Sequence, residues 1–382
     1  MPRYIVGGGL VAAIAFTGCL SPVRRSERDL ATGFLDDAWT RYKRAYLHAD
    51  GYVLDRTRNG GEVTSEGQAY ALLRAAWSGD RSTFTSVLSW TDRHLLRADG
   101  LLSWRWSAAS GGKVLDVNSA TDADEDMAFA LIVAASRFER PDYLARARAT
   151  LRAIRAGARV EIPGGWFPSA GNWATAPRVI NLSYFTPYAY PYFDLLDPDG
   201  RWGEVTTAGY GLLDAAVTAP ARLPPDFVVV GLDGALSPPA DEALLRTFSF
   251  DAVRIFWRVA LDCRLHRRPS ACRYPGGDAL ADLLRRDGRL VTDYQLDGTR
   301  VSDQESLTFY ACALPMLDER APDLATGLKQ TRLSPEALKP VLGQPDRYFD
   351  LNWVWFGLAL SGDLIVERTP AVEQLAKMAG GS

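Results

Sequence analysis

Three acidic stretches of the sequence combine residue types and spacing that could support acid–base chemistry. The first is "VTSEGQAYALLRAAW", residues 63–77, whose apolar stripe predicts a helix with Ser65 as the N-cap and Gln68 completing a capping box. A helix start of this kind is stable without another acid. Glu66, in the first turn, is therefore either a partner of the helix dipole or an acid that takes part in a reaction.

The second stretch is "NSATDADEDMAFALIVAASRFE", residues 118–139, which predicts an amphipathic helix. Four carboxylates crowd its start, at Asp122, Asp124, Glu125 and Asp126. The helix dipole stabilises one or two such acids by about 0.3–1 kcal/mol each, so four suggest a further role. The three aspartates copy the first ligands of an EF-hand loop. However, Met127 replaces the required Gly and Val133 the closing Glu, so we expect no calcium site.

The third stretch is "FSFDAVRIFWRVALD", residues 248–262, in a further helical pattern. Asp251 and Arg254 are spaced i, i+3 and predict an ion pair on one helix face. Such a pair contributes only a few tenths of a kcal/mol on many ordinary helices. By itself this stretch therefore indicates little about function.

Aromatic side chains cluster in segments that could line a sugar-binding groove. Trp104 and Trp106 lie two apart in a predicted strand and should share a face, while Trp166 and Trp173 lie in the Gly- and Pro-rich "PGGWFPSAGNWATAP". Most of the 11 Trp and 15 Tyr residues belong in the core on general grounds. Within the loop, Trp166 and Trp173 are equally consistent with the core and with a groove.

The sequence lacks the residues that several other classes of function require. The formal net charge of −3 and the absence of a basic run argue against a nucleic-acid partner. With three His residues and no paired Cys or His at ligand spacing, we expect no metal site and no cofactor. There is no G-x-S-x-G elbow and no Gly-rich phosphate loop. Carboxylate chemistry in a protein rich in Trp and Tyr favours action on glycosidic bonds.

The N-terminal residues predict export. Arg3 precedes an apolar run, residues 5–17, that is too short to span a bilayer of about 30 Å, so residues 1–18 are expected to be a signal peptide. The sequence "FTGC" resembles a lipobox, in which Cys19 would be lipidated and would anchor the protein to a membrane. Phe16 fits that motif less well than Leu, which leaves cleavage by ordinary signal peptidase open. The expected location is periplasmic or secreted.

In an oxidising compartment, two of the three remaining cysteines could form a disulfide. Cys263 and Cys272 could close a short loop, which would leave Cys312 as a buried thiol. The spacing alone does not settle this connectivity.

The elements that must position these residues are mostly helices. Helical spacing recurs in about twelve segments, beginning near residues 30, 66, 81, 122, 141, 186, 201, 250, 276, 304, 347 and 369. Short extended pieces lie between them, at "LLSWRW", "KVLDVN", "DFVVVG" and "RLVTDYQL". No linker interrupts the pattern, so residues 20–382 are expected to form one domain.

Taken together, these stretches resemble the family 8 glycoside hydrolases, in particular the periplasmic endoglucanases that accompany bacterial cellulose synthesis. The resemblance is collinear through "TSEGQAYALL", "NSATDADEDMAFALI", "NLSYFTPYAYPYF" and "FDAVRIFWR". The sequence departs from the usual pattern at Leu182, where Pro is common, at Ala69, which replaces a frequent Gly, and at Glu125, which adds a carboxylate.

The resemblance implies an all-α (α/α)6 barrel and an inverting endo-hydrolase of β-1,4-linked glycans that needs no cofactor. Position by position, Glu66 matches the general acid, Asp251 the general base, and Asp122 a carboxylate that holds the sugar at the cleavage point. Substrate-binding roles are expected at Tyr184, Arg254, Trp104, Trp106, Trp173 and Asn181.

Several alternatives stay open at this point. The protein could be a glycan-binding lipoprotein without catalysis, a hydrolase of the same family acting on xylan, chitosan or lichenan, or a polysaccharide lyase on the same type of barrel. The expected partner is a β-1,4-linked polysaccharide, with the cellulose synthase machinery as a further candidate. We expect a monomer.

Overall fold

The computed structural model describes residues 22–57, 61–109, 111–217 and 220–380. The predicted signal peptide and Cys19 lie outside these ranges. The described chain is mainly helical, with short antiparallel strands. The helices are α1 (Pro22–Tyr46), α2 (Ser65–Ser78), α3 (Arg81–His94), α4 (Thr121–Arg137), α5 (Asp142–Gly157), α6 (Tyr190–Leu196), α7 (Trp202–Ala216), α8 (Arg254–His266), α9 (Pro269–Cys272), α10 (Ala279–Asp287), α11 (Leu307–Arg320), α12 (Pro322–Gln330), α13 (Pro335–Leu338), α14 (Tyr348–Ser361), α15 (Leu364–Arg368) and α16 (Val372–Gly380).

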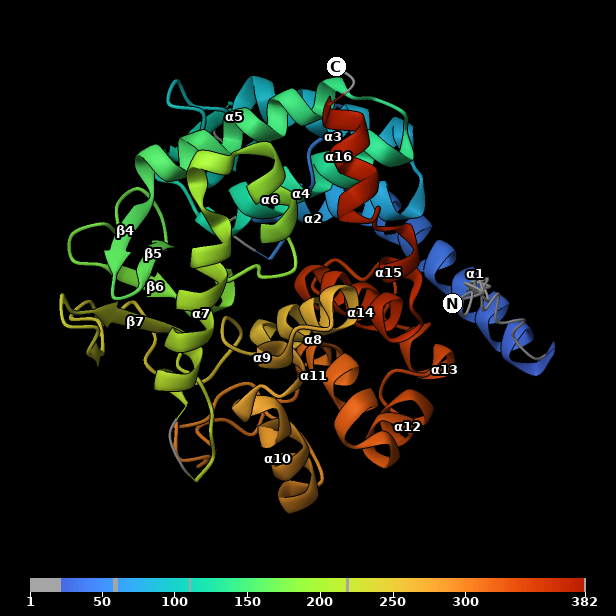
Figure 1. Cartoon of the computed structure of the whole chain (residues 1–382). Helices are drawn as coiled ribbons and strands as arrows, with labels where there is room; N and C mark the ends of the chain where they lie inside the picture. The colour runs from blue at the N-terminus through green and yellow to red at the C-terminus, as the bar shows by residue number, and fades with distance from the viewer. Residues whose placement is uncertain (1–21, 58–60, 110, 218–219, 381–382) are drawn as a thin grey trace, which may run out of the picture.

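Burial separates these helices into an inner and an outer set. In α4 every residue from Thr121 to Ala135 is buried, and α2, α8, α11 and α14 are also buried on nearly all sides. By contrast α5 and α10 bury one stripe at helical spacing, as a helix at the surface does. Figure 1 shows α10 and α12 at the periphery and α2, α4, α8 and α14 nearer the middle. With α6, the inner set has six members among the described residues.

Three small sheets connect the helix ends. One contains β1 (Glu62–Thr64), β2 (Arg105–Ser107) and β3 (Lys113–Asp116), and a hairpin contains β4 (Arg159–Ile162) and β5 (Gly165–Pro168). The third contains β6 (Val179–Asn181), β7 (Phe227–Val230) and β8 (Leu236–Ser237). In this last sheet Asn181 pairs with Phe227, which brings the segment before Tyr184 beside the segment that follows Asp226.

The predicted capping box at α2 is wrong. Thr64 is the N-cap, and its Oγ1 accepts a hydrogen bond from the Gly67 N–H, while Ser65 is already the first helical residue. Gln68 is buried and turns to another segment, where its Oε1 accepts from the Val53 N–H. Because a buried amide must find partners, tertiary contacts outweigh the local motif here.

Other element predictions also need correction. The helix expected near residue 250 begins at Arg254, so Asp251 lies in a turn before it. The helix expected near residue 30 begins at Pro22, and α12 was not predicted. "RLVTDYQL" forms only isolated bridges at Tyr294, to Phe248 and Arg300, because no neighbouring strand extends the pairing. The strands expected around "KVLDVN" and "DFVVVG" are confirmed.

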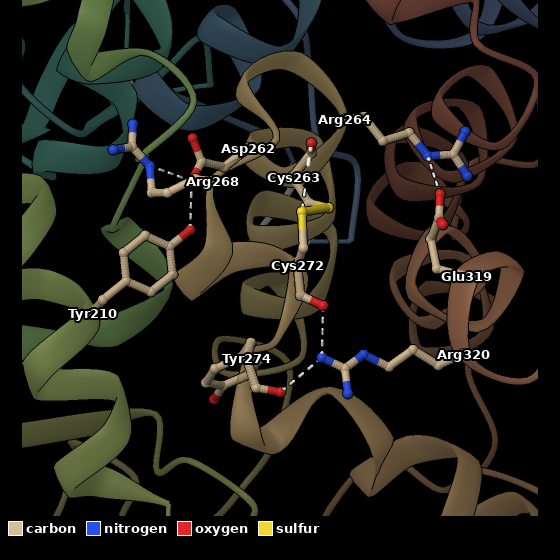
Figure 2. Close-up of a disulfide and its surroundings, with 9 residues drawn as sticks. All are labelled: Tyr210, Asp262, Cys263, Arg264, Arg268, Cys272, Tyr274, Glu319 and Arg320. Carbon is tan, nitrogen blue, oxygen red and sulfur yellow. Dashed lines mark hydrogen bonds and ion pairs between the residues drawn. A yellow bond between two sulfur atoms is a disulfide. The ribbon is translucent and has the colours of Figure 1, made fainter.

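A disulfide joins Cys263 to Cys272, and Cys312 is a buried free thiol (Figure 2). This confirms the pairing that the spacing allowed. The bond lies at the C-terminal end of α8, where Tyr210 of α7 and Arg268 both donate hydrogen bonds to Asp262 Oδ2, at 2.6 and 2.9 Å. These contacts fix the far end of the helix whose first residue is Arg254.

Within the described ranges, no single helix has the length and apolar character to cross a membrane. The pair Tyr348–Ser361 and Leu364–Gly380 passes that test only when taken together, and it is bent by 83° between its parts.

Candidate active site

The four carboxylates at the start of α4 reach four different neighbours. Asp122 contacts Arg254, and Asp124 accepts a 2.9 Å hydrogen bond from the Leu102 N–H. Glu125 accepts from the Thr186 hydroxyl at 2.7 Å, and Asp126 pairs with Arg258. One helix turn therefore anchors the segment before Trp104, the segment after Tyr184, and the first two turns of α8. This accounts for the acidic crowding that the dipole alone did not explain.

Arg254 is the centre of the cluster. Its Nη1 donates to Asp122 Oδ2 at 3.1 Å, to the Tyr70 hydroxyl at 3.1 Å and to Glu66 Oε2 at 3.4 Å. Its Nη2 donates to Asp251 Oδ1, as the i, i+3 spacing predicted. The three acids predicted from distant parts of the sequence thus meet on one guanidinium.

Exposure divides these charged groups into two pairs. The side chains of Arg254 and Asp122 are 2% and 1% exposed, whereas those of Glu66 and Asp251 are 26% and 31% exposed. A group that exchanges a proton with substrate or water must be reachable from solvent. Glu66 and Asp251 meet that requirement, while Asp122 and Arg254 form the floor beneath them.

The electrostatics of the floor follow from burial. Desolvation raises the pKa of Asp122 to about 6, although the Arg254 cation acts in the opposite direction. Burial likewise raises the pKa of Tyr184 well above its usual range, and the negative charges of Asp122 and Asp251 add to that effect. Tyr184 is therefore a neutral phenol whose ring lies against Arg254, 5.6 Å from the guanidinium carbon to the ring centre.

The local backbone explains how Glu66 reaches the cluster. Its helix begins where β1 ends, and the Ser65 N–H donates to the Trp104 carbonyl at 3.0 Å, which ties the helix start to the β2 segment. The next residue must be small, because a Cβ on Gly67 would lie 1.9 Å from the Tyr348 hydroxyl. The "SEGQ" sequence therefore combines a solvent-accessible acid with a close helix contact.

The predicted aromatic positions fall into two groups. Trp104 is half-buried beside the Ser65 backbone, with Arg105 over its ring, and Trp173 is 41% exposed. Asn172 Oδ1 accepts from the Ser119 N–H, which ties the Trp173 loop to the start of α4. Trp104 and Trp173 therefore remain candidates for stacking on sugar rings.

Trp106, Trp166 and Asn181 lie elsewhere. Trp106 is buried against Tyr52 and Trp90, whereas Trp104 precedes β2, and the register of β2 against β3 is irregular between Arg105 and Trp106, so the regular alternation that the prediction assumed is not present. Trp166 is a core residue. Asn181 is fully buried, and its Oδ1 accepts from the Ser183 N–H and hydroxyl. Burial argues against direct sugar contact by these three residues.

Sequence reasoning missed several residues of the site. Tyr70 touches Arg254, and Asp226 holds the turn that carries Asp251. Arg258 forms a buried ion pair with Asp126, and Tyr188 donates to the same carboxylate at 3.0 Å. Tyr70 and Arg258 lie four residues after Glu66 and Arg254, as Asp126, which the acidic stretch had already singled out, lies four after Asp122, so helical spacing from each predicted residue could have found them.

The described residues contain no group of three or more His, Cys, Asp or Glu side chains arranged to hold a metal ion. The chemistry that the arrangement itself supports is proton donation and proton removal by two accessible carboxylates held on one cation.

Comparison with known proteins places this geometry in a family. Residues 25–271 match the model of "Glycosyl hydrolases family 8". A curated relative, the "Probable endoglucanase" of Novacetimonas hansenii, is 37% identical over 241 residues, which are 59% of this chain and 67% of that protein. The chain spans about two thirds of the length of the first curated relatives it matches.

Solved structures share the architecture. The endo-β-1,4-glucanase CMCax from Acetobacter xylinum superposes with a TM-score of 0.68 at 27% identity, covering 86% of this chain and 98% of that one. A β-1,3-1,4-glucanase from Paenibacillus sp. X4 gives a TM-score of 0.74 at 20% identity, covering 88% of this chain and 93% of that one, which shows likeness of fold alone. The predicted (α/α)6 barrel is confirmed.

Proposed function

The chain belongs to family 8 of the glycosyl hydrolases, and we propose that it is an inverting endo-β-1,4-glucanase. The observation that carries this proposal is the placement of two solvent-accessible carboxylates, Glu66 and Asp251, on different nitrogens of one buried guanidinium. The endoglucanase relatives support the reaction class. The residue roles are supported by exposure and geometry.

In the proposed reaction, Glu66 donates a proton to the glycosidic oxygen while Asp251 removes a proton from a water molecule. That water attacks the anomeric carbon from the face opposite the leaving group, the bond from carbon to the glycosidic oxygen breaks, and the configuration inverts. Glu66 ends ionised and Asp251 ends protonated, so proton exchange with solvent restores the starting state. An inverting pair is separated by about 6.5–9.5 Å because the water must fit between base and sugar.

The buried residues prepare these two acids. Arg254 fixes both carboxylates through different nitrogens, so neither can rotate freely away from the bond to be cleaved. Asp122 balances part of the Arg254 charge from below. A sugar over this floor would also meet the neutral Tyr184 hydroxyl and the two accessible tryptophans.

The test uses a soluble β-1,4-glucan and three variants. Glu66→Gln and Asp251→Asn should each lower kcat by about 10²- to 10⁴-fold, since each removes a proton-transfer group that contributes that much. The control is Asp142→Asn, which should match wild type, because Asp142 is exposed and forms its ion pair with Arg140 at the surface. NMR of the first product should show the inverted anomer. A retained anomer, or unsaturated products absorbing in the ultraviolet, would exclude this mechanism.

The preferred substrate is part of the proposal. We favour a cellulose-type glucan because the curated relatives are endoglucanases. The β-1,3-1,4-glucanase similarity and a structure of Rex8A from Paenibacillus barcinonensis complexed with xylose make lichenan and xylan the natural comparisons. Initial rates on cellulose, lichenan, xylan and chitosan should rank carboxymethylcellulose or cellulose first. A higher rate on xylan or chitosan would contradict the proposed preference for a cellulose-type glucan.

Export and a role beside cellulose synthesis are also proposed. The signal-like residues 1–18 support export, and Cys19 supports a lipid anchor. Fractionation of cells producing the full chain should place it outside the cytoplasm. Cys19→Ser should release a lipid-anchored form from the membrane fraction, whereas an unchanged distribution would exclude the anchor.

A further inference from the structure

Asp226 is a fully buried carboxylate just before β7, and its side chain is directed entirely at the segment that carries Asp251. Its Oδ1 accepts hydrogen bonds from the Ser249 N–H at 2.9 Å and from the Ala252 N–H at 2.8 Å. Its Oδ2 accepts from the Ser249 hydroxyl. The three contacts bracket Asp251 on both sides.

The bracketed segment has little regular structure of its own. Residues 250–253 form a turn, and α8 begins only at Arg254. The backbone before the turn is fixed at two further points, by the Asp226 N–H donating to the Thr247 carbonyl and by the bridge between Phe248 and Tyr294. Without Asp226, two backbone N–H groups next to Asp251 would lose their acceptor, and nothing else in the segment replaces it.

The same residue connects the turn to the opposite wall of the site. Asp226 directly precedes Phe227, which pairs with Asn181 in the β6–β7 ladder. Asn181 in turn accepts hydrogen bonds from Ser183, next to Tyr184. The β6–β7 pair, which Asp226 directly precedes, is therefore a second link between the segments of Asp251 and Tyr184, besides their shared contact with Arg254.

The location of this carboxylate is unfavourable for folding. Burial, together with the neighbouring negative charge of Asp251, raises the pKa of Asp226 to about 7. A buried acid beside a second acid lowers stability, and such arrangements concentrate at functional sites. The cost is consistent with a role in holding the turn for the reaction.

We propose that Asp226 is a positioning residue that holds the Asp251 turn so that the Asp251 carboxylate faces the attacking water. This inference rests on the function proposed above, in which Asp251 is the general base. Asp226 itself is fully buried and does not meet substrate. Its effect should therefore appear in kcat, because it acts on the orientation of the base, while KM should change little.

Three substitutions separate position from charge. Asp226→Ala removes all three acceptor contacts and should lower kcat about 100-fold with KM within about twofold of wild type. Asp226→Asn keeps an amide oxygen for both backbone N–H groups and can donate to the Ser249 hydroxyl, so it should stay within about fivefold of wild type. Asp226→Glu keeps the charge but has the wrong reach, and it should be slower than Asp226→Asn.

The matched control is Asp233→Ala, which removes a similar carboxylate contact to a backbone N–H, that of Ala235, from an exposed turn after β7. It should match wild type. Circular dichroism and thermal melting establish that each variant is folded at the assay temperature. The proposal is overturned if folded Asp226→Ala keeps more than about a third of wild-type kcat, or if Asp226→Glu is faster than Asp226→Asn.

Hydrogen exchange tests the same contacts without activity. Amides in the peptide 248–254 should exchange at least about tenfold faster in Asp226→Ala than in wild type, and near the wild-type rate in Asp226→Asn. Unchanged exchange in Asp226→Ala would show that the turn does not depend on Asp226. An inactive wild type would reject the proposed function, while the exchange result would still decide whether Asp226 holds the turn.

Discussion

Two ion-pair layers lie one helix turn apart between α4 and α8, and they differ in composition and access. In the upper layer Asp122 pairs with Arg254, and in the lower layer Asp126 pairs with Arg258 through two hydrogen bonds at 2.8 and 2.9 Å. The two layers arise from the same i, i+4 spacing on both helices. They nevertheless perform different tasks.

The lower layer is balanced and closed. Arg258 and Asp126 are each 2% exposed, one charge opposes the other, and Tyr188 contacts both groups. In the upper layer three acids surround one cation, and two of them reach solvent. The comparison teaches that solvent access and charge balance, rather than the ion pair itself, distinguish the layer that the proposed reaction uses from the closed layer below it.

The largest expected effect comes from breaking the upper layer. Arg254→Ala should lower kcat on the order of 10³-fold, because it releases both reactive carboxylates and removes the fixed charge beneath them. Glu66 and Asp251 can turn to water, but Asp122, which is 1% exposed, stays buried without its cation, so some stability should be lost as well. The measurement is kcat on a soluble β-1,4-glucan at a temperature where melting shows the variant folded. A kcat within tenfold of the wild-type value would contradict the proposal that Arg254 holds both carboxylates for the reaction.

Breaking the lower layer should act on stability instead. Arg258→Ala leaves Asp126 buried without its cation and should lower the free energy of unfolding by about 3–5 kcal/mol. Urea unfolding followed by tryptophan fluorescence measures this difference. The double variant Asp126→Leu with Arg258→Met is the control and should recover much of the lost stability, because it leaves no unpaired buried charge. An unchanged free energy of unfolding in Arg258→Ala would contradict the structural role of the lower layer.

The smallest expected effect is a change in the pH dependence of stability, which tests the buried acid of the upper layer. Because the pKa of Asp122 is raised in the folded protein to about 6, its protonated form is favoured by folding. Its contribution to stability is therefore fully present below about pH 4 and is lost as the pH rises through about 6. Relative to Asp122→Asn, wild type should lose a few kcal/mol of unfolding free energy across this range. Unfolding at pH 4, 5, 6 and 7 measures it, and a constant difference would contradict the raised pKa.

The helical class and the strands near "KVLDVN" and "DFVVVG" follow from local patterns, and the cysteine pair is one that the spacing allowed without settling it. The same is true of the acidic helix starts, which drew attention to Glu66 and Asp122 before any contact was known. Local patterns failed at Gln68 and Trp106 and left Trp166 undecided. Each of these has a polar group or a ring that finds its partner in a distant segment, which spacing along one element cannot report.

The sequence by itself determined which residue types stand at helix starts, and hence which acids were available for chemistry. Only the tertiary structure decided which acids are placed to react, because it brought Glu66, Asp122 and Asp251 to one guanidinium and left two of them open to solvent. It also decided that Asp226 would support the turn of Asp251. Burial and hydrogen-bond satisfaction depend on what surrounds a side chain in three dimensions, and these segments lie far apart in the chain.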